Sequence, residues 1–351
     1  MTLSPDIALD PRILEAAMRG DERAFEDLIA PHRAELHAHC YRMLGSLHDA
    51  EDALQDGLLR SWRGLDRFEG RSSLRSWLYR IATNSCLRMI ERRPKRVLPT
   101  DYGPAADAHS PPGEALVEST WIEPLPDVVA GIPDGRAGPE ARYEQRESVE
   151  LAFVAALQHL PARQRAVLIL RDVLGFAPAE IAAALDTSAA ALSSALQRAH
   201  RTIDERLPEQ SQQATLRALG DERLRSVVET YAEAWERGDV DAILALLTSD
   251  AAFAMPPRAT WFRGREAVGA FLARTPHAPV SQWRVLPTSA GGQPAFATYT
   301  RDADGRRWEA HAIDVLTLGP DGLIAEVTAF LDAGLVRRFG LPGEIHDQEV
   351  L

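Results

Sequence analysis

The stretch 68–93, FEGRSSLRSWLYRIATNSCLRMIERR, decides how the first part of the chain is interpreted. The chain has 351 residues and a formal net charge of −12, yet residues 60–96 carry eleven Lys and Arg against three Asp and Glu. A basic stripe that also contains aromatic side chains is typical of a surface that faces an acidic polymer. The alternative is a solvated helix face, and this feature alone leaves both interpretations open.

The spacing of apolar residues predicts a two-faced helix in this stretch, with Ser72 or Ser73 as its N-cap. The core-facing stripe consists of Leu74, Leu78, Ile81, Ser85 and Met89. The other stripe consists of Trp77, Arg80, Asn84 and Arg88. An aromatic ring, two guanidinium groups and an amide on one face are able to contact phosphate, stack on an unpaired base and hydrogen-bond its edge. We therefore expect this face to bind nucleic acid, in locally single-stranded form.

A second helix is predicted just before this one, over residues 48–62, HDAEDALQDGLLRSW. Its apolar face contains Ala50, Ala53, Leu54, Gly57, Leu58 and Trp62. Its other face contains Asp49, Asp52 and Asp56, with Gln55 nearby. Acidic residues early in a helix suit its macrodipole. An exposed acidic face serves solvation in most proteins, and here it is also a candidate docking surface.

Length and charge predict several domains, because a chain of this size exceeds one ordinary core. A helical bundle is expected over residues 10–97 and a second helical unit over 146–208. Residues 98–145 are acidic and rich in Pro and Gly, which is typical of an extended linker. A further domain is expected over 215–340.

Several classes of protein and site are not expected. The chain has no apolar run of about eighteen residues that would predict a membrane span. Its first residues, MTLSPDIALDPR, do not resemble a secretory signal, so a cytoplasmic protein is expected. Cys40 and Cys86 lie outside any metal-ligand spacing and are expected to be buried, reduced thiols. No metal or cofactor is predicted.

Residues 180–199, EIAAALDTSAAALSSALQRA, show a helix-turn-helix pattern with its turn at 186–188. The inward positions of the second helix are Leu192, Leu196, Ala199 and Ile203. Its outward face offers Ser193, Ser194, Gln197, Arg198 and Arg201. Such a face suits the major groove of DNA. Other helical hairpins show similar patterns, so the motif is only moderately specific.

The C-terminal part predicts an α+β cone, in which three helices pack against a curved antiparallel sheet. Its strand-like runs are joined by Gly-Gly and Asp-Gly turns. The candidate pocket residues are Trp235, Trp261, Tyr299, His311, Asp314 and Asp332. His311 and Asp314 lie on one strand, whose period of two places them on opposite faces unless a bulge intervenes. Because this weakens an acid–base pair, no catalytic residue is predicted and the chain is not expected to be an enzyme.

Two DNA-binding patterns joined by an acidic linker are more specific than either alone. The chain resembles sigma-70 family initiation factors of the extracytoplasmic-function type. Residues 49–84 resemble region 2 of that family, and residues 160–203 resemble region 4. WIEPLPD, residues 121–127, is similar to a linker sequence in members that carry a C-terminal SnoaL-like domain. The cone resembles the SnoaL-like branch of the NTF2 fold, which encloses an apolar pocket.

The resemblance implies a role for each surface. Docking on the β′ clamp helices of core RNA polymerase falls to Asp49, Asp52, Gln55 and Asp56. Capture of a flipped base of the −10 element falls to Phe68, Glu69, Gly70 and Arg71, supported by Trp77, Arg80, Asn84 and Arg88. Reading of the −35 element falls to Ser188, Ser193, Ser194, Gln197, Arg198 and Arg201. Many members have Lys or Arg where this chain has Ser193 and Ala195, which predicts weaker phosphate contact.

The expected function is therefore that of a sigma factor that directs promoter recognition and transcription initiation. Its expected partners are core RNA polymerase, including the β flap, and promoter DNA, with a small apolar ligand in the cone. The cone is expected to modulate activity, and the linker resembles a connector that threads the RNA exit path. The net negative charge favours dependence on a partner for DNA binding. Two alternatives stay open: a stand-alone ligand-sensing helix-turn-helix regulator, and a cyclase- or isomerase-like enzyme.

Overall fold

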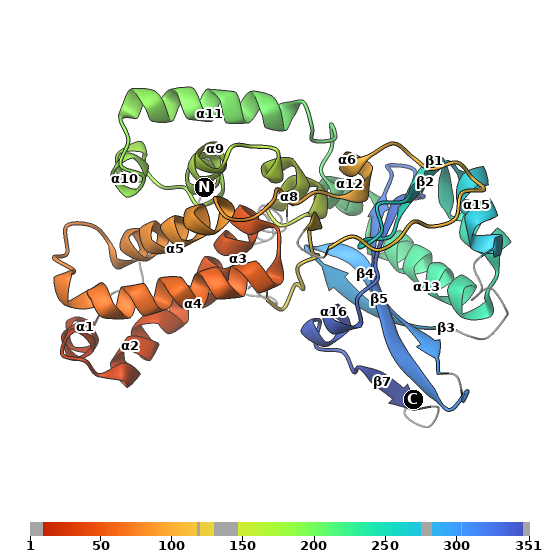
Figure 1. Ribbon diagram of the computed structural model, residues 1–351, viewed down its shortest axis with the longest axis horizontal. Coiled ribbons are helices and arrows are strands. Elements are labelled where there is room, and N and C mark those ends of the chain that lie inside the picture. Colours follow the sequence, from red (N-terminus) through yellow and green to blue (C-terminus); the bar gives the residue numbers. More distant parts are fainter. Residues whose placement is uncertain (1–9, 118–119, 130–146, 275–282, 303, 347–351) are drawn as a thin grey trace. The chain divides into compact units, whose positions relative to one another are not determined.

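The computed structural model describes residues 10–117, 120–129, 147–274, 283–302 and 304–346 (Figure 1). The chain divides into two compact units. Unit 1 combines Met1–Arg96 with Val128–Leu207, and unit 2 combines Val97–Asp127 with Pro208–Leu351. Residues 97–127, named the connector below, therefore cluster with the C-terminal domain rather than standing apart as a linker. Most of the remaining predicted linker lies outside the described residues.

Unit 1 is helical throughout its described part. Its helices are α1 (Pro11–Met18), α2 (Glu22–Ile29), α3 (Arg33–Leu44), α4 (Leu47–Gly64), α5 (Leu74–Ile90), α8 (Leu151–Gln158), α9 (Ala162–Leu168), α10 (Pro178–Ala184) and α11 (Ala189–Asp204). Short 3-10 turns at Ala30–His32 and Leu65–Arg67 and a π turn at Ile169–Val173 join some of them. None of the helices in the described ranges has the length and apolar content that crossing a bilayer requires.

Serine caps begin the two central helices of the first bundle. The Ser46 hydroxyl accepts the Asp49 amide at 3.2 Å, and α4 starts there. The Ser73 hydroxyl accepts the Ser76 amide at 3.1 Å and begins α5, which selects Ser73 from the two predicted caps. A side-chain oxygen at this position satisfies an amide that the helix itself leaves free. The bundle core contains the fully buried Leu36, Tyr41, Met43, Leu47, Leu65 and Leu78.

The second helical block packs on the first through buried polar groups. Arg42 donates to the Ser148 carbonyl at 3.0 Å, and the Gln158 amide donates to the Arg42 carbonyl at 3.2 Å. Arg165 donates to the Met43 carbonyl and to Gln158. These bonds satisfy guanidinium groups that would be expensive to bury alone. The predicted helix-turn-helix is present as α10 and α11, with Asp186 in the left-handed region (φ 49°) at the turn.

Unit 2 has the α+β architecture that the sequence predicts. Its helices are α6 (Pro99–Tyr102), α12 (Gln212–Leu219), α13 (Asp221–Arg237), α14 (Val240–Ala245), α15 (Arg265–Arg274) and α16 (Ala333–Arg338). Its strands are β1 (Leu247–Ala254), β2 (Trp261–Arg263), β3 (Trp283–Ala290), β4 (Gln293–Arg301), β5 (Arg307–Leu318), β6 (Ile324–Phe330) and β7 (Glu344–His346). The three predicted helices correspond to α13, α14 and α15.

The strands form one sheet in the order β2-β1-β6-β5-β4-β3, with β7 paired to β5. The pair β1 and β6 is parallel, so the expectation of a wholly antiparallel sheet was wrong at this point. The two strands are distant in sequence, and no hairpin turn links them to signal their direction. The domain core joins helix and sheet residues, including Tyr231, Phe262, Phe296 and Leu316.

Candidate functional site

The outer face of α5 lies beside the loop 68–71. The rings of Phe68 and Trp77 have centroids 5.3 Å apart at an interplanar angle of 54°. Arg80 is exposed, and Trp77 and Asn84 are half-buried. Fixing a large aromatic ring at the edge of an exposed basic face lowers the ordering entropy of stacking a base there. The loop and the helix therefore form one continuous candidate surface for nucleic acid.

The loop itself presents exposed polar groups. Gly70 has a φ of +68°, a conformation that a residue with a side chain rarely adopts, so a glycine suits this turn. Glu69 and Arg71 are exposed and form an ion pair at 2.8 Å. An exposed pair of this kind contributes little stability, so either group is available to DNA. Tyr79, an aromatic of the same stretch, instead lies in the core with its hydroxyl 3.3 Å from Glu35.

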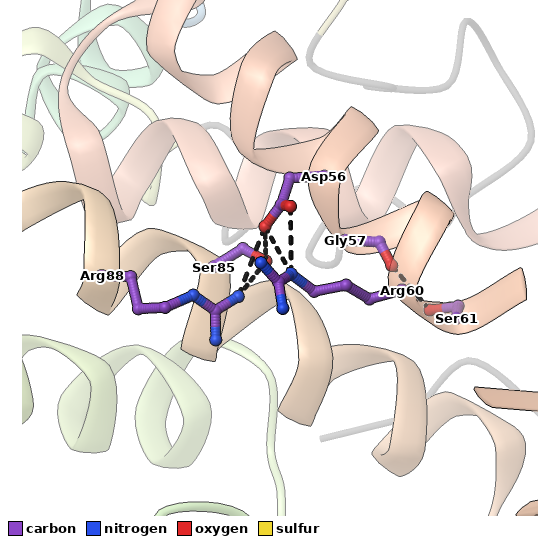
Figure 2. A network of polar contacts seen from close by, with 6 residues as sticks. All are labelled: Asp56, Gly57, Arg60, Ser61, Ser85 and Arg88. Carbon is purple, nitrogen blue, oxygen red and sulfur yellow. Dashed lines mark hydrogen bonds and ion pairs between the residues drawn. The ribbon is translucent and has the colours of Figure 1, made fainter. Parts of the chain in front are cut away.

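Asp56 joins α4 to α5 through the polar network in Figure 2. Its carboxylate accepts the Arg60 guanidinium at 2.8 Å, the Ser85 hydroxyl at 2.8 Å and the Arg88 guanidinium at 3.3 Å. These contacts, above all the hydrogen bond from Arg60, lower the pKa of Asp56. Arg88 is therefore directed toward Asp56, although the sequence places it on the same stripe as Trp77. Two predicted sites, one for polymerase and one for DNA, share this network.

Asp49 differs from the exposed residue that the sequence predicts. Its side chain is 2% exposed and lies between Arg93 and Arg96, with Arg96 Nη2 at 2.7 Å from its carboxylate. These two cations neutralise Asp49 inside unit 1, so its carboxylate does not belong to the outer acidic face. The part of the predicted docking residues that reaches solvent is Asp52, Gln55 and Asp56.

Leu59 adds an apolar side chain to this acidic face. It follows Asp52, Gln55 and Asp56 at helical spacing and is 56% exposed. Leu59 is not among the predicted docking residues. The available signal was the pair Leu58-Leu59, because neighbouring positions on a helix cannot both face the core. Single exposed leucines are common on protein surfaces, so Leu59 is a candidate contact residue because of its position beside Asp52, Gln55 and Asp56.

The outward side of α11 presents the residues predicted from the helix-turn-helix pattern. Ser188, Ser193, Ser194, Gln197, Arg198 and Arg201 are all exposed. The Ser188 hydroxyl also caps the helix by accepting the Ala191 amide at 3.2 Å. Inward, Leu192, Ala199 and Ile203 are buried. The pattern of burial therefore agrees with a recognition helix that has one free side.

Unit 2 contains a partly open cavity of about 480 Å³. Three of the six predicted pocket residues line it, namely Trp235, His311 and Asp314. The register of β4 against β5 shifts here, since Thr298 pairs with Ala312 and Tyr299 pairs with Ala310. His311 is the extra residue of this bulge. The bulge resolves the open question from the sequence, because it brings His311 and Asp314 to the same cavity.

The other three predicted pocket residues have structural contacts elsewhere. The Trp261 indole donates to the Gly103 carbonyl at 2.8 Å. The Tyr299 hydroxyl donates to the Pro342 carbonyl at 3.0 Å. The Asp332 side chain caps α16. None of the three is among the residues found to line the cavity in the described part of unit 2.

The connector is bound along the C-terminal domain by main-chain hydrogen bonds. Ala106 donates to the Trp261 carbonyl and Leu116 to the Pro257 carbonyl, each at 2.8 Å. Gly113 donates to the Thr260 hydroxyl at 2.7 Å. The connector therefore runs along β2 and the residues just before it. Its residues 109–112 line the cavity.

The WIEPLPD stretch forms the second part of this attachment. Its Leu125 carbonyl accepts the Gly291 amide at 2.8 Å, and its Asp127 carboxylate accepts the Gly292 amide at 2.7 Å. Trp121, Ile122 and Leu125 are buried. The apolar residues of the WIEPLPD motif are therefore buried against the C-terminal domain.

Comparison with known families accounts for three segments of the chain. Residues 28–96 match sigma-70 region 2, residues 150–203 match sigma-70 region 4, and residues 228–327 match the SnoaL-like domain. These segments coincide with the α3–α5 bundle, the helix-turn-helix block and the cone. The matches agree with the family that the sequence resembles.

Individual relatives extend the similarity to more than nine tenths of the chain. The extracytoplasmic-function sigma factor SigG of Mycobacterium tuberculosis is 43% identical over 332 residues, which cover 93% of this chain and 85% of SigG. SigM of the same species is 30% identical over 194 residues, 55% of this chain. The crystal structure of M. tuberculosis SigJ has a TM-score of 0.54 at 21% identity and covers 92% of this chain and 100% of that chain. This last likeness supports the fold alone.

Proposed function

Because the chain belongs to the extracytoplasmic-function sigma factors, proteins of transcription initiation rather than enzymes, we propose specific roles for its exposed surfaces. The α5 face with loop 68–71 captures the −10 element, and α11 reads the −35 element. The acidic face of α4 binds core RNA polymerase in the cytoplasm. The C-terminal domain modulates initiation by holding the connector. The observation that carries this proposal is the joined surface of Phe68, Trp77, Arg80 and Asn84.

The test of the main activity is run-off transcription with purified core polymerase on a library of upstream DNA fragments. Transcripts that appear only when the protein is added support promoter selection by this chain. If no transcript appears with full-length or truncated protein, and the protein shifts DNA by itself, a stand-alone regulator becomes the better account. The expected weak binding to free DNA follows from the net charge of −12.

Trp77→Ala is expected to lower promoter opening by roughly tenfold, since stacking on one base contributes about 1–3 kcal/mol. Asn84→Ala is expected to lower it by roughly fivefold, since a hydrogen bond to a base edge contributes about 1 kcal/mol. Opening is measured by permanganate reactivity of unpaired thymines, and polymerase binding by a separate titration. Binding to polymerase should not change, because both residues lie on α5 and neither is among the residues that hydrogen-bond Asp56 of the acidic face. Wild-type opening in both variants would contradict the assignment of the α5 face.

Leu59→Glu is expected to weaken binding to core polymerase by about tenfold, because burying a leucine at an interface contributes about 1.5–3 kcal/mol. Leu59→Met is the matched control, since it keeps an apolar side chain at the same exposed position. Asp52→Arg tests the charge of the same face without breaking the Asp56 network. Affinities equal to wild type for Leu59→Glu and Asp52→Arg would exclude this face.

The modulation proposal rests on where the connector is bound. The connector of this chain resembles the family segment that enters the RNA exit path of polymerase. To enter that path, the connector has to be released from the C-terminal domain. Here its Leu125 and Asp127 are bonded to the β3–β4 turn of unit 2. The C-terminal domain thus competes with polymerase for the connector and restrains initiation.

Asp127→Ala is expected to raise run-off yield severalfold, because it removes the acceptor of the Gly292 amide and weakens the bound state by about 1 kcal/mol. Glu114→Ala makes the same charge change at an exposed connector residue and should leave the yield unchanged. Deleting residues 215–351 should also raise the yield and keep promoter choice. Unchanged or lower yield for Asp127→Ala would overturn restraint by the connector.

A further inference from the structure

The cavity of unit 2 has apolar walls contributed by helices and strands alike. Its walls include Val240, Ile243, Phe253, Phe271, Leu272 and Trp283. A volume of about 480 Å³ lies within the range of sites that enclose small organic molecules. The space is partly open to solvent, so a small molecule has a way in.

One buried carboxyl group interrupts the apolar wall. Asp314 is 3% exposed and lies on β5 at the cavity. Burial raises its pKa to about 7, and in the part of the chain that the structure describes no ion pair or hydrogen bond offsets the raised pKa. Below that pH the group is a carboxylic acid that can donate a hydrogen bond into the cavity. His311, placed there by the bulge, is the second polar group on the same strand.

We propose that this cavity binds a compact, largely apolar molecule that carries a carbonyl-type acceptor, and that connector residues 109–112 complete the site. The acceptor is held by Asp314, and the apolar body fills the space between the aromatic walls. The inference deepens the proposed function, on which it rests, by giving the domain that holds the connector a ligand. Ligand occupancy then strengthens the hold on the connector.

The charges around the cavity select an acceptor over an amine. A cationic amine would pair with an ionised carboxylate, but Arg258 and Arg274 also line the cavity. Two guanidinium groups disfavour a third positive charge in a site of low dielectric constant. A neutral acceptor meets no such repulsion and takes its hydrogen bond from the protonated acid. The chemistry of the lining therefore disfavours a cationic ligand and is compatible with a neutral carbonyl compound.

The connector takes part in the site as well as covering it. His109, Ser110, Pro111 and Pro112 line the cavity. Arg274 donates to the carbonyls of Ala108 and Ser110, which fixes this segment at the rim. A ligand that contacts both the cone and this segment binds more tightly when the connector is docked. By linkage, it must then stabilise the docked connector by the same factor.

The first experiment is a titration of full-length protein with Prodan, a neutral naphthyl ketone whose emission shifts to the blue in apolar surroundings. Saturable binding with blue-shifted emission is expected for the wild-type protein. Ala312→Phe should remove binding by filling the cavity, because Ala312 is a buried lining residue. Absence of saturable binding to wild type, or full binding to Ala312→Phe, would overturn the site.

The role of Asp314 is tested by two replacements of similar size. Asp314→Asn keeps a hydrogen-bond donor and should retain binding below neutral pH. Asp314→Leu removes the donor and should weaken binding roughly five- to tenfold. Glu309→Gln, on the exposed part of the same strand, is the control and should bind as wild type does. Equal affinity of the Asn and Leu variants would overturn the hydrogen-bonding role.

Coupling to the connector is tested with Thr260→Val, which removes the acceptor of the Gly113 amide at a residue outside the cavity lining. Prodan affinity should fall roughly fivefold in this variant. In wild type, Prodan should slow hydrogen exchange at the amides of Ala106, Gly113 and Leu116. Unchanged affinity together with unchanged exchange would overturn the coupling.

None of these measurements involves polymerase or DNA, so the two proposals fail separately. If Prodan binds and the connector responds, yet Asp127→Ala leaves run-off yield unchanged, the ligand site stands and restraint of initiation is overturned. If Asp127→Ala raises yield and Prodan does not bind, the ligand site is overturned and restraint stands.

Discussion

Replacing Asp49 by alanine is expected to destabilise unit 1 by about 3–5 kcal/mol, the loss typical of removing one partner of a buried ion pair. Arg96 is almost as buried as Asp49, with 7% of its side chain exposed, and would lose its contact with this carboxylate. Arg93 lies at the same carboxylate from the more open side. A whole domain is commonly stable by only about 5–15 kcal/mol, so this loss is severe.

Hydrogen exchange of full-length protein, read on peptides from α3 to α5, measures this loss in unit 1 alone. Asp52→Ala is the matched control on the same helix, because the Asp52 side chain is 44% exposed and its contacts with His48 and Arg93 are long. It should change stability by less than about 1 kcal/mol. If Asp49→Ala exchanges no faster than Asp52→Ala, the triad of Asp49, Arg93 and Arg96 does not stabilise the bundle.

Asp49 also shows what helical spacing omits. Position in a helix pattern separates an apolar face from a polar one, but it does not reveal a cation that arrives from another segment. Arg93 and Arg96 follow the end of α5, and only tertiary packing brings them to the start of α4. The local features of the same bundle were easier to predict. The Ser73 cap and the inward Leu74 and Leu78 depend on neighbouring residues and are confirmed.

In the C-terminal domain too, some features could be predicted from the sequence and others could not. Helix periodicity and glycine turns predicted its class, which the structure confirms. The parallel pairing of β1 with β6 and the bulge at His311 are properties of strand register, and period-two alternation carries no signal for them. The binding of the connector to the C-terminal domain was equally impossible to predict from the sequence. Proline and acidic residues predicted an extended chain, while its hydrogen bonds to Trp261, Pro257 and Gly291 depend on the folded cone.

Asp314→Asn is expected to stabilise unit 2 at pH 8 by up to roughly 4 kcal/mol, the value that follows from a pKa raised from 3.8 to about 7 by burial. In the unfolded chain this acid ionises near pH 4, whereas in the folded chain it keeps its proton until about pH 7. Wild-type stability therefore falls as pH rises from about 4 to 7 and levels off above. Asparagine carries no ionisable proton and removes this slope.

Other titratable and charged groups surround Asp314, so the comparison must isolate it. These are Tyr231 from α13 and His311 from its own strand, with His109, Arg258 and Arg274 on the cavity lining. All five are unchanged in the variant, and the difference between the two proteins across pH 4 to 8 therefore reports the carboxyl group. Hydrogen exchange of β5 peptides in full-length protein, corrected for intrinsic rates, gives this difference. Parallel profiles for the two proteins would contradict a buried acid at the cavity. A gain confined to high pH would mean that the natural sequence keeps a destabilising group there, which is typical of a residue retained for binding.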